Sequence, residues 1–167
     1  MENWKPIPEF SRYDISDMGN VRNRRTGRIL KTSRNQSGVV FVGMMKDGER
    51  KQHSRVVSHL VAQNFLPPPP TDFFDSVINL NGMRADNRME NLAWRPLWFM
   101  VRYQHQFESR LHKQIDRPIM DRKSGEQWIN SWECAKANGL LETDVVLAIM
   151  NHTYTWPTYQ MFEVLEV

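Results

Sequence analysis

Four consecutive prolines, Pro67–Pro70, divide the chain into two parts, because no helix and no central strand can continue through them. Proline fixes φ and has no backbone N–H, so it ends a helix and removes a hydrogen bond from a sheet. The run predicts a stiff, extended connection, and a proline-rich ligand is the alternative interpretation. Because 167 residues suffice for one ordinary domain or for two to three small modules, we expect small modules on either side of it.

Before the prolines, closely spaced turn residues leave room for short strands and one short helix. Asp47-Gly48 is a hairpin turn signal, and the segment 39–45 is rich in strand-forming residues. Apolar residues at positions 56, 57, 60, 61 and 65 have the spacing of a buried helix. The sequence therefore predicts an antiparallel β module followed by a helix over 56–65.

After the prolines, short strands and helices alternate. The expected strands are 76–80, 118–121, 127–129 and 159–164. One helix is expected to begin at 88–94, and further helices are expected over 97–114, 131–138 and 142–151. Ser131 is the expected N-cap of its helix, and Gly139 the residue that ends it. Strands and helices in this order predict an α+β fold.

Charge is distributed unevenly along the chain, although the net charge is only +3. Residues 1–60 hold 12 Lys and Arg against 6 Asp and Glu, whereas residues 118–167 hold 3 against 7. Phosphate contacts dominate nucleic-acid affinity, so the first third predicts a polyanion as partner, with a solvated charged face as the alternative. The expected binding residues are Arg22, Arg24, Arg25, Arg28, Lys31 and Arg34, supported by Lys46, Arg50, Lys51 and Arg55.

Composition excludes several other classes of protein. No apolar run approaches the roughly 18 residues of a membrane-spanning helix, and the opening MENWKPIPEF is unlike a secretory signal. The single cysteine, Cys134, excludes an intrachain disulfide and a cysteine-built zinc site. We therefore expect a monomer of the reducing cytoplasm with no membrane partner.

Three groups of motifs follow one another along the chain. They are Trp4–Pro8 with Tyr13–Ser16 and Gly19–Arg22, then Asn81-Gly82 through Asn87 and Asn91 to Trp94, and finally Gly125, Ser131, Glu133, the helix at 143–150 and Tyr159. In this order they resemble the β module, the HNH unit and the helix-turn-helix module of phage HNH homing endonucleases. The resemblance implies a basic β module over 1–55, a ββα HNH-like unit over 56–96, a connecting helix over 97–117 and a helix-turn-helix-like module over 118–167.

The resemblance also identifies the positions at which a nuclease centre would lie. An HNH unit needs a histidine that activates water and oxygen ligands that hold a divalent cation. In the frame of the family, Asn79 stands at the position of the histidine and Ile78 at that of a metal ligand, while Asn87 and Asn91 keep the loop and helix positions. An amide takes no proton at neutral pH and an isoleucine binds no magnesium, so the resemblance predicts a degenerate centre with no catalytic residue and no metal.

Three hypotheses about function stay open. The first is a phage or mobile-element protein that binds nucleic acid on an HNH scaffold with an inactive nuclease centre, and it needs no cofactor. The second is a binder of structured RNA or of a host ribonucleoprotein such as the ribosome, because acidic residues in the last module repel DNA phosphates. The third is an active DNA-nicking endonuclease that uses His59, Asn79 and Asn91 with Mg²⁺. A partly buried or surface histidine is the alternative role for His59.

Overall fold

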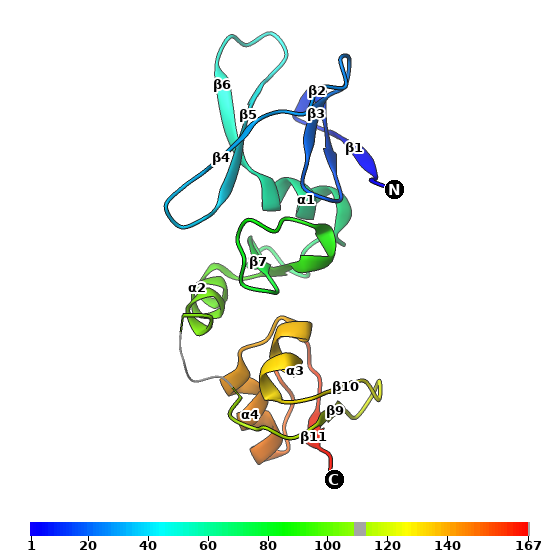
Figure 1. Cartoon of the computed structure of the whole chain (residues 1–167), viewed down its shortest axis with the longest axis vertical. Coiled ribbons are helices and arrows are strands. Elements are labelled where there is room, and N and C mark those ends of the chain that lie inside the picture. Colours follow the sequence, from blue (N-terminus) through cyan, green and yellow to red (C-terminus); the bar gives the residue numbers. More distant parts are fainter. Residues whose placement is uncertain (109–112, 167) are drawn as a thin grey trace. The chain divides into compact units, whose positions relative to one another are not determined.

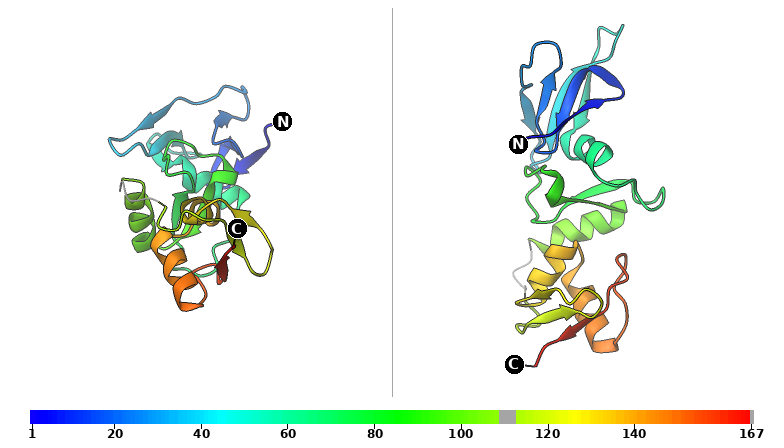
Figure 2. Two further views of the ribbon diagram at one scale, coloured as in Figure 1. Left: turned by 60° about the horizontal axis from the view of Figure 1, so that its bottom comes forward. Right: turned by 90° about the vertical axis from the view of Figure 1, so that its right-hand side faces the viewer.

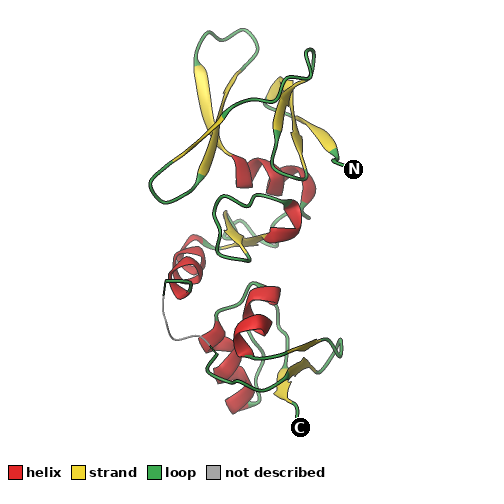
Figure 3. Ribbon diagram, viewed as in Figure 1, coloured by secondary structure: helices red, strands yellow, loops and turns green. Residues whose placement is uncertain are grey.

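The computed structural model describes residues 1–108 and 113–166, which form a mixed α+β structure (Figure 1). The chain divides into two compact units, Met1–Leu97 and Trp98–Val167, called here the first and the second unit. Small antiparallel sheets and helices make up both of them (Figure 3). The α+β fold class that the sequence predicts is therefore confirmed.

The first unit begins with two antiparallel three-stranded sheets (Figure 2). Their strands are β1 (Trp4–Ile7), β2 (Phe10–Ser16) and β3 (Val21–Asn23) in one sheet, and β4 (Thr32–Arg34), β5 (Val40–Met45) and β6 (Gln52–Val56) in the other. Burial alternates along β5, so Val40, Val42 and Met44 face the core while the residues between them are half-buried. This alternation is the period of two that a half-buried strand requires.

Helix α1 (Val57–Phe65) continues directly from β6 and buries one face against both sheets. Val57, Leu60 and Val61 lie in the same hydrophobic cluster as Phe10 and Ile15. The helix ends at Leu66, which is extended because Pro67 follows it. The helix predicted over 56–65 is confirmed, and the indole of Trp94 donates a hydrogen bond of 3.1 Å to the Pro67 carbonyl.

A two-stranded hairpin, β7 (Ser76–Asn79) with β8 (Leu92–Arg95), completes the first unit. The helix expected to begin at 88–94 is wrong. Only a single 3₁₀ turn, η1 (Met89–Asn91), forms there, because Leu92–Arg95 pair with β7 in the register Val77↔Trp94 and Asn79↔Leu92. Asn91 therefore ends the 3₁₀ turn directly before β8 and does not lie in an α-helix.

The second unit contains α2 (Leu97–Gln106) apart from its first residue, followed by β9 (Ile119–Asp121), β10 (Gln127–Trp128), α3 (Ser131–Asn138), α4 (Glu142–Asn151) and β11 (Phe162–Val164). Its sheet has the order β10-β9-β11, and its core gathers Ile119, Cys134, Leu140 and Phe162. Burial raises the pKa of the Cys134 thiol to about 12, so this cysteine is an inert core residue.

Two details of the second unit differ from the sequence expectations. The helix expected over 97–117 ends at Gln106; its segment 109–112 lies outside the described residues, and Lys113 has a φ of 65° that no helix accommodates. The N-cap of α3 is Asn130, whose side chain accepts a 2.9 Å bond from the Glu133 N–H, and not Ser131. Ser131 instead donates its hydroxyl to the buried carboxylate of Glu142.

Candidate nucleic-acid interface

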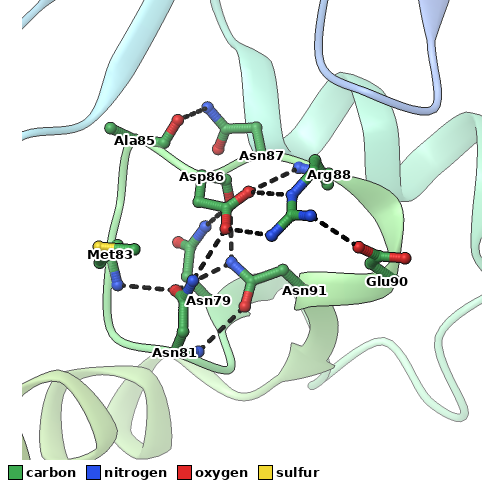
Figure 4. A network of polar contacts seen from close by, with 9 residues as sticks. All are labelled: Asn79, Asn81, Met83, Ala85, Asp86, Asn87, Arg88, Glu90 and Asn91. Carbon is green, nitrogen blue, oxygen red and sulfur yellow. Dashed lines mark hydrogen bonds and ion pairs between the residues drawn. The ribbon is translucent and has the colours of Figure 1, made fainter.

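The loop between β7 and β8 is held by a network of amide side chains (Figure 4). At the end of β7, Asn79 donates a 2.7 Å hydrogen bond to the Asp86 carbonyl. Asn91 donates to the same carbonyl at 2.8 Å and to Asn81 Oδ1 at 3.0 Å, and its own Oδ1 accepts the Asn81 backbone N–H at 3.0 Å. Asn79 and Asn91 are 8% and 6% exposed, so these side chains are committed to the loop's own backbone.

Asp86 and Arg88 form the charged part of this network. The guanidinium of Arg88 contacts both oxygens of Asp86 at 2.9 Å and reaches Glu90 at 2.9 Å, while Asn81 donates to Asp86 at 2.8 Å. Hydrogen bonding to Arg88 lowers the pKa of Asp86 below its ordinary value. Sequence reasoning missed both residues, although an acid and a base two positions apart in a loop is a pattern that could have indicated them.

Two positions of this hairpin offer no free ligand to a divalent cation. Ile78 is 2% exposed and offers no ligand, and the carboxylate of Asp86 is already paired with Arg88 at both oxygens. Over residues 1–108 and 113–166, no group of three or more His, Cys, Asp or Glu side chains could hold a metal. His59 lies on α1 edge-on to the Trp94 ring at 6.0 Å, and within the described residues no hydrogen bond joins it to Asn79 or Asn91.

One buried atom of the loop stands outside the network. Asn87 is 6% exposed, and its Oδ1 has no hydrogen-bond partner among the described residues. The β2–β3 turn packs against this residue: a Cβ added at Gly19 would lie 3.0 Å from Asn87 Cβ, and Met89 donates its N–H to the Asp17 carbonyl at 2.8 Å. The loop is therefore fixed from both sides, by its own amides and by the amino-terminal module.

A pH dependence of stability follows from the lowered pKa of Asp86. The ionised form is favoured in the folded state, so its contribution is complete above the ordinary carboxyl range near pH 4 and disappears as the pH falls through the lowered pKa. We expect Asp86→Asn to destabilise the protein at pH 7 and the difference from wild type to shrink in acid. Urea unfolding at several pH values measures this, with the exposed Asp72→Asn as control; a difference that does not shrink anywhere as the pH falls below the ordinary carboxyl range near pH 4 would contradict the assignment.

Four of the ten predicted binding cations are committed to ion pairs inside the first unit. Arg22 and Arg24 contact the buried Asp14 at 3.1 and 3.0 Å, and Arg22 also lies 4.2 Å above the Trp4 ring. Lys46 and Arg55 contact Glu9 at 3.7 and 3.1 Å, which lowers the pKa of that carboxyl. These cations already have anionic partners, so a phosphate would have to compete for them.

The other six predicted cations are exposed and have no ion pair among the described residues. They are Arg25, Arg28, Lys31 and Arg34 between the end of β3 and the end of β4, and Arg50 and Lys51 in the β5–β6 connection. The first group is presented by a turn in which Asn23 Oδ1 accepts the N–H groups of Arg25 and Thr26. In the β5–β6 connection, Asp47 pairs with Arg12 and Glu49 contacts His53, both at 2.6 Å, so both acids there already have partners.

Arg12 is a further basic residue that sequence reasoning missed. It lines an open cavity of about 630 Å³ together with Ser11, Asn23, Arg24 and Arg25. Arg12 lies on β2 two residues before Asp14, so both side chains point to the same side of the sheet. This period of two along the predicted strand is the sequence signal that could have identified Arg12. The cavity thus brings three guanidinium groups to the exposed end of the first unit's amino-terminal sheet.

The second unit presents a different surface. No Lys or Arg occurs in α4, and its exposed residues include Leu147 and Met150 at 54% and 69% exposure. Three of the cations described in this unit are paired: Lys113 with Asp116, Arg122 with Glu163 and Lys136 with Glu133. No helix described in the structure combines the length and apolarity needed to cross a membrane.

Comparisons with known proteins agree with the fold and with the motifs. A NUMOD4 motif matches residues 2–44, which cover β1 to β4 and most of β5. Two uncharacterized HNH endonucleases of Acanthamoeba polyphaga mimivirus are 35% identical over 95 residues and 28% identical over 137 residues. These alignments cover 56% and 82% of this chain but only 23% and 39% of the relatives, so the chain spans well under half the length of either.

A solved structure described as DNA binding and cleavage by the HNH homing endonuclease I-HmuI shares the fold. The two chains align over 99% of each, with a TM-score of 0.55 and 20% identity. The chain therefore carries an amino-terminal NUMOD4 motif and shares the fold of an HNH homing endonuclease. The motif, the relatives and the shared fold together confirm the resemblance found in the sequence.

Proposed function

We propose that the chain binds DNA through the six unpaired cations of the first unit and has no metal-dependent nuclease centre in the β7–β8 hairpin. The observation that carries the proposal is the contrast between the two surfaces. Arg25, Arg28 and Lys31 are exposed without acidic partners, whereas the side-chain amides at the end of β7 and just before β8 are hydrogen-bonded within the loop. Free guanidinium and ammonium groups bind phosphate, and consumed amides bind neither water nor metal.

DNA is the nucleic acid we propose because the structural relative is described as binding and cleaving it. Structured RNA and a host ribonucleoprotein are the alternative targets. We also propose that the protein acts as a monomer in the cytoplasm of a host cell that carries a phage or another mobile element. A single buried cysteine suits that reducing compartment.

A second candidate function is metal-dependent DNA nicking, which the description of the relatives as HNH endonucleases favours. It would require a base at Asn79 or His59. The Asn79 amide donates to the Asp86 carbonyl and accepts no proton at neutral pH. Burial lowers the pKa of His59, so this ring is neutral near pH 7 and able to accept a proton. Among the described residues, no group of three or more His, Cys, Asp or Glu side chains could hold the metal ion that this function needs.

The binding proposal is tested by fluorescence anisotropy with a DNA duplex and an RNA duplex of the same sequence over a range of salt concentrations. Six phosphate contacts predict a slope of about −5 for log affinity against log salt on duplex DNA. Affinity should then fall about 10³-fold between about 50 and 200 mM salt. Binding of the RNA duplex alone, or of neither duplex, would contradict the proposal.

A further inference from the structure

A cavity of about 530 Å³ lies in the first unit where the β1–β2 turn, β5, β6 and α1 meet. Its volume falls within the range of small-ligand sites. Ile7, Phe10 and Leu60, which are at most 4% exposed, contribute apolar surface to it, and Phe41 adds a half-buried aromatic ring. The cavity does not belong to the hairpin described above, and it takes no part in the six-cation surface.

The cavity is also lined by polar side chains with unused hydrogen-bonding capacity. Ser54 on β6 and His59 and Gln63 on α1 have no side-chain hydrogen bond among the described residues. Their neighbours differ, since Arg55 donates to Glu9 and Asn64 donates to the Leu60 carbonyl. Burial lowers the pKa of His59, so at neutral pH its ring offers one donor and one acceptor.

A neutral, flat ring with donors and acceptors along its edge complements such a lining. Apolar and aromatic groups accept the face of the ring, while an imidazole, an amide and a hydroxyl read its edge. A nucleobase has this chemistry, and its face stacks on aromatic side chains without regard to sequence. A charged ligand would fit less well, because Glu9 and Arg55 at the cavity already neutralise each other at 3.1 Å.

Strand β6 connects the cavity with the cations. Arg50 and Lys51 lie just before the strand, and Ser54 lines the cavity three residues after Lys51, about 10 Å further along an extended chain. Nucleotides in one strand of a duplex are spaced about 3.4 Å apart, so two or three of them span this distance. Phosphates on Arg50 and Lys51 would therefore bring a neighbouring base within reach of the cavity.

We propose that this cavity receives one unpaired nucleobase of the bound nucleic acid. The inference rests on the proposed function, because the phosphates on the six-cation surface supply the base. A base inside a duplex must first leave its stack, whereas a bulged or unpaired base has lost that cost already. The protein should therefore prefer a duplex that contains one unpaired base.

The test uses two DNA duplexes that differ at one nucleotide. One carries a single extra base and the other an abasic residue at the same place, so their phosphates are identical. Wild-type protein is expected to bind the base-containing duplex about tenfold more tightly, with equal salt slopes for both. Ser54→Tyr should fill the cavity and abolish the difference, and Gln63→Ala should reduce it to a few-fold.

The control is Gln36→Ala, an exposed residue of the β4–β5 turn outside the cavity, which should keep the full preference. Circular dichroism shows whether each variant is folded. If Ser54→Tyr does not fold, the test uses Gln63→Ala instead. Equal affinity of wild type for the two duplexes, with a normal salt slope, would overturn the cavity proposal and leave the proposed function standing. Salt-sensitive binding to neither duplex would overturn both, and a preference retained by Ser54→Tyr would overturn the cavity as its site.

Discussion

Replacing Arg25, Arg28 and Lys31 together with glutamine is expected to flatten the salt dependence of DNA binding by about two to three units. Each of these side chains is exposed and without an ion pair among the described residues, so each is free to replace one counterion on a phosphate. Between about 50 and 200 mM salt the triple variant should lose roughly 40-fold in affinity, compared with about 10³-fold for wild type. Fluorescence anisotropy on one duplex measures both slopes.

A matched control removes the same charge from the other unit. Arg117, Arg122 and Lys123 are also exposed, and their replacement with glutamine changes the net charge of the chain by the same amount. We expect this variant to keep the wild-type slope, because long-range effects of charge are largely screened at these salt concentrations. A flattened slope in the control and an unchanged slope in the first variant would place DNA binding in the second unit.

Asn91→Ala is expected to destabilise the first unit by about 3 kcal/mol. The Asn91 side chain makes three hydrogen bonds at 2.8 to 3.0 Å, and its loss leaves the Asn81 N–H without this partner, while Asn81 Oδ1 still accepts the Met83 N–H at 2.9 Å. Each buried polar group left unsatisfied costs about 1–3 kcal/mol. Urea unfolding followed by circular dichroism measures the change, with the transition of the first unit fitted separately if the two units unfold in two steps.

Asn87→Ala provides the control for this effect, because Asn87 lies in the same loop and is equally buried, at 6% exposure. Its Oδ1 has no partner among the described residues, and its Nδ2 makes only a long bond of 3.4 Å to the Ala85 carbonyl. Its removal should change the unfolding free energy by less than about 1 kcal/mol. Equal losses in the two variants would show that burial, and not the amide network, determines stability here.

Much of the fold follows from local patterns in the sequence. The helix α4 and the hairpin of β9 and β10 form where apolar spacing and turn residues predict them. The helix prediction for Arg88–Trp94 fails because the apolar residues of this segment also suit a strand. Pairing with β7 across the loop decides in favour of the strand. Such a long-range pairing leaves no local signature.

The site is less accessible from sequence than the fold. The resemblance to HNH homing endonucleases drew attention to Asn79, Asn87 and Asn91, but it did not reveal that Asn91 bonds to Asn81 while Asn87 Oδ1 has no partner among the described residues. The ten cations were found by counting charge. Their division into six free and four paired groups depends on Asp14 and Glu9, which come close to their partners only in the folded sheets.

The proposal that the chain has no nuclease centre is tested most directly by incubating the full chain with supercoiled plasmid in Mg²⁺ and in Mn²⁺. The chain is expected to retard the plasmid on a gel without nicking it, and Asn79→Ala should behave like wild type. Metal-dependent nicking by the wild-type chain that disappears in Asn79→Ala would contradict the account, because the amide network would then be part of a working active site.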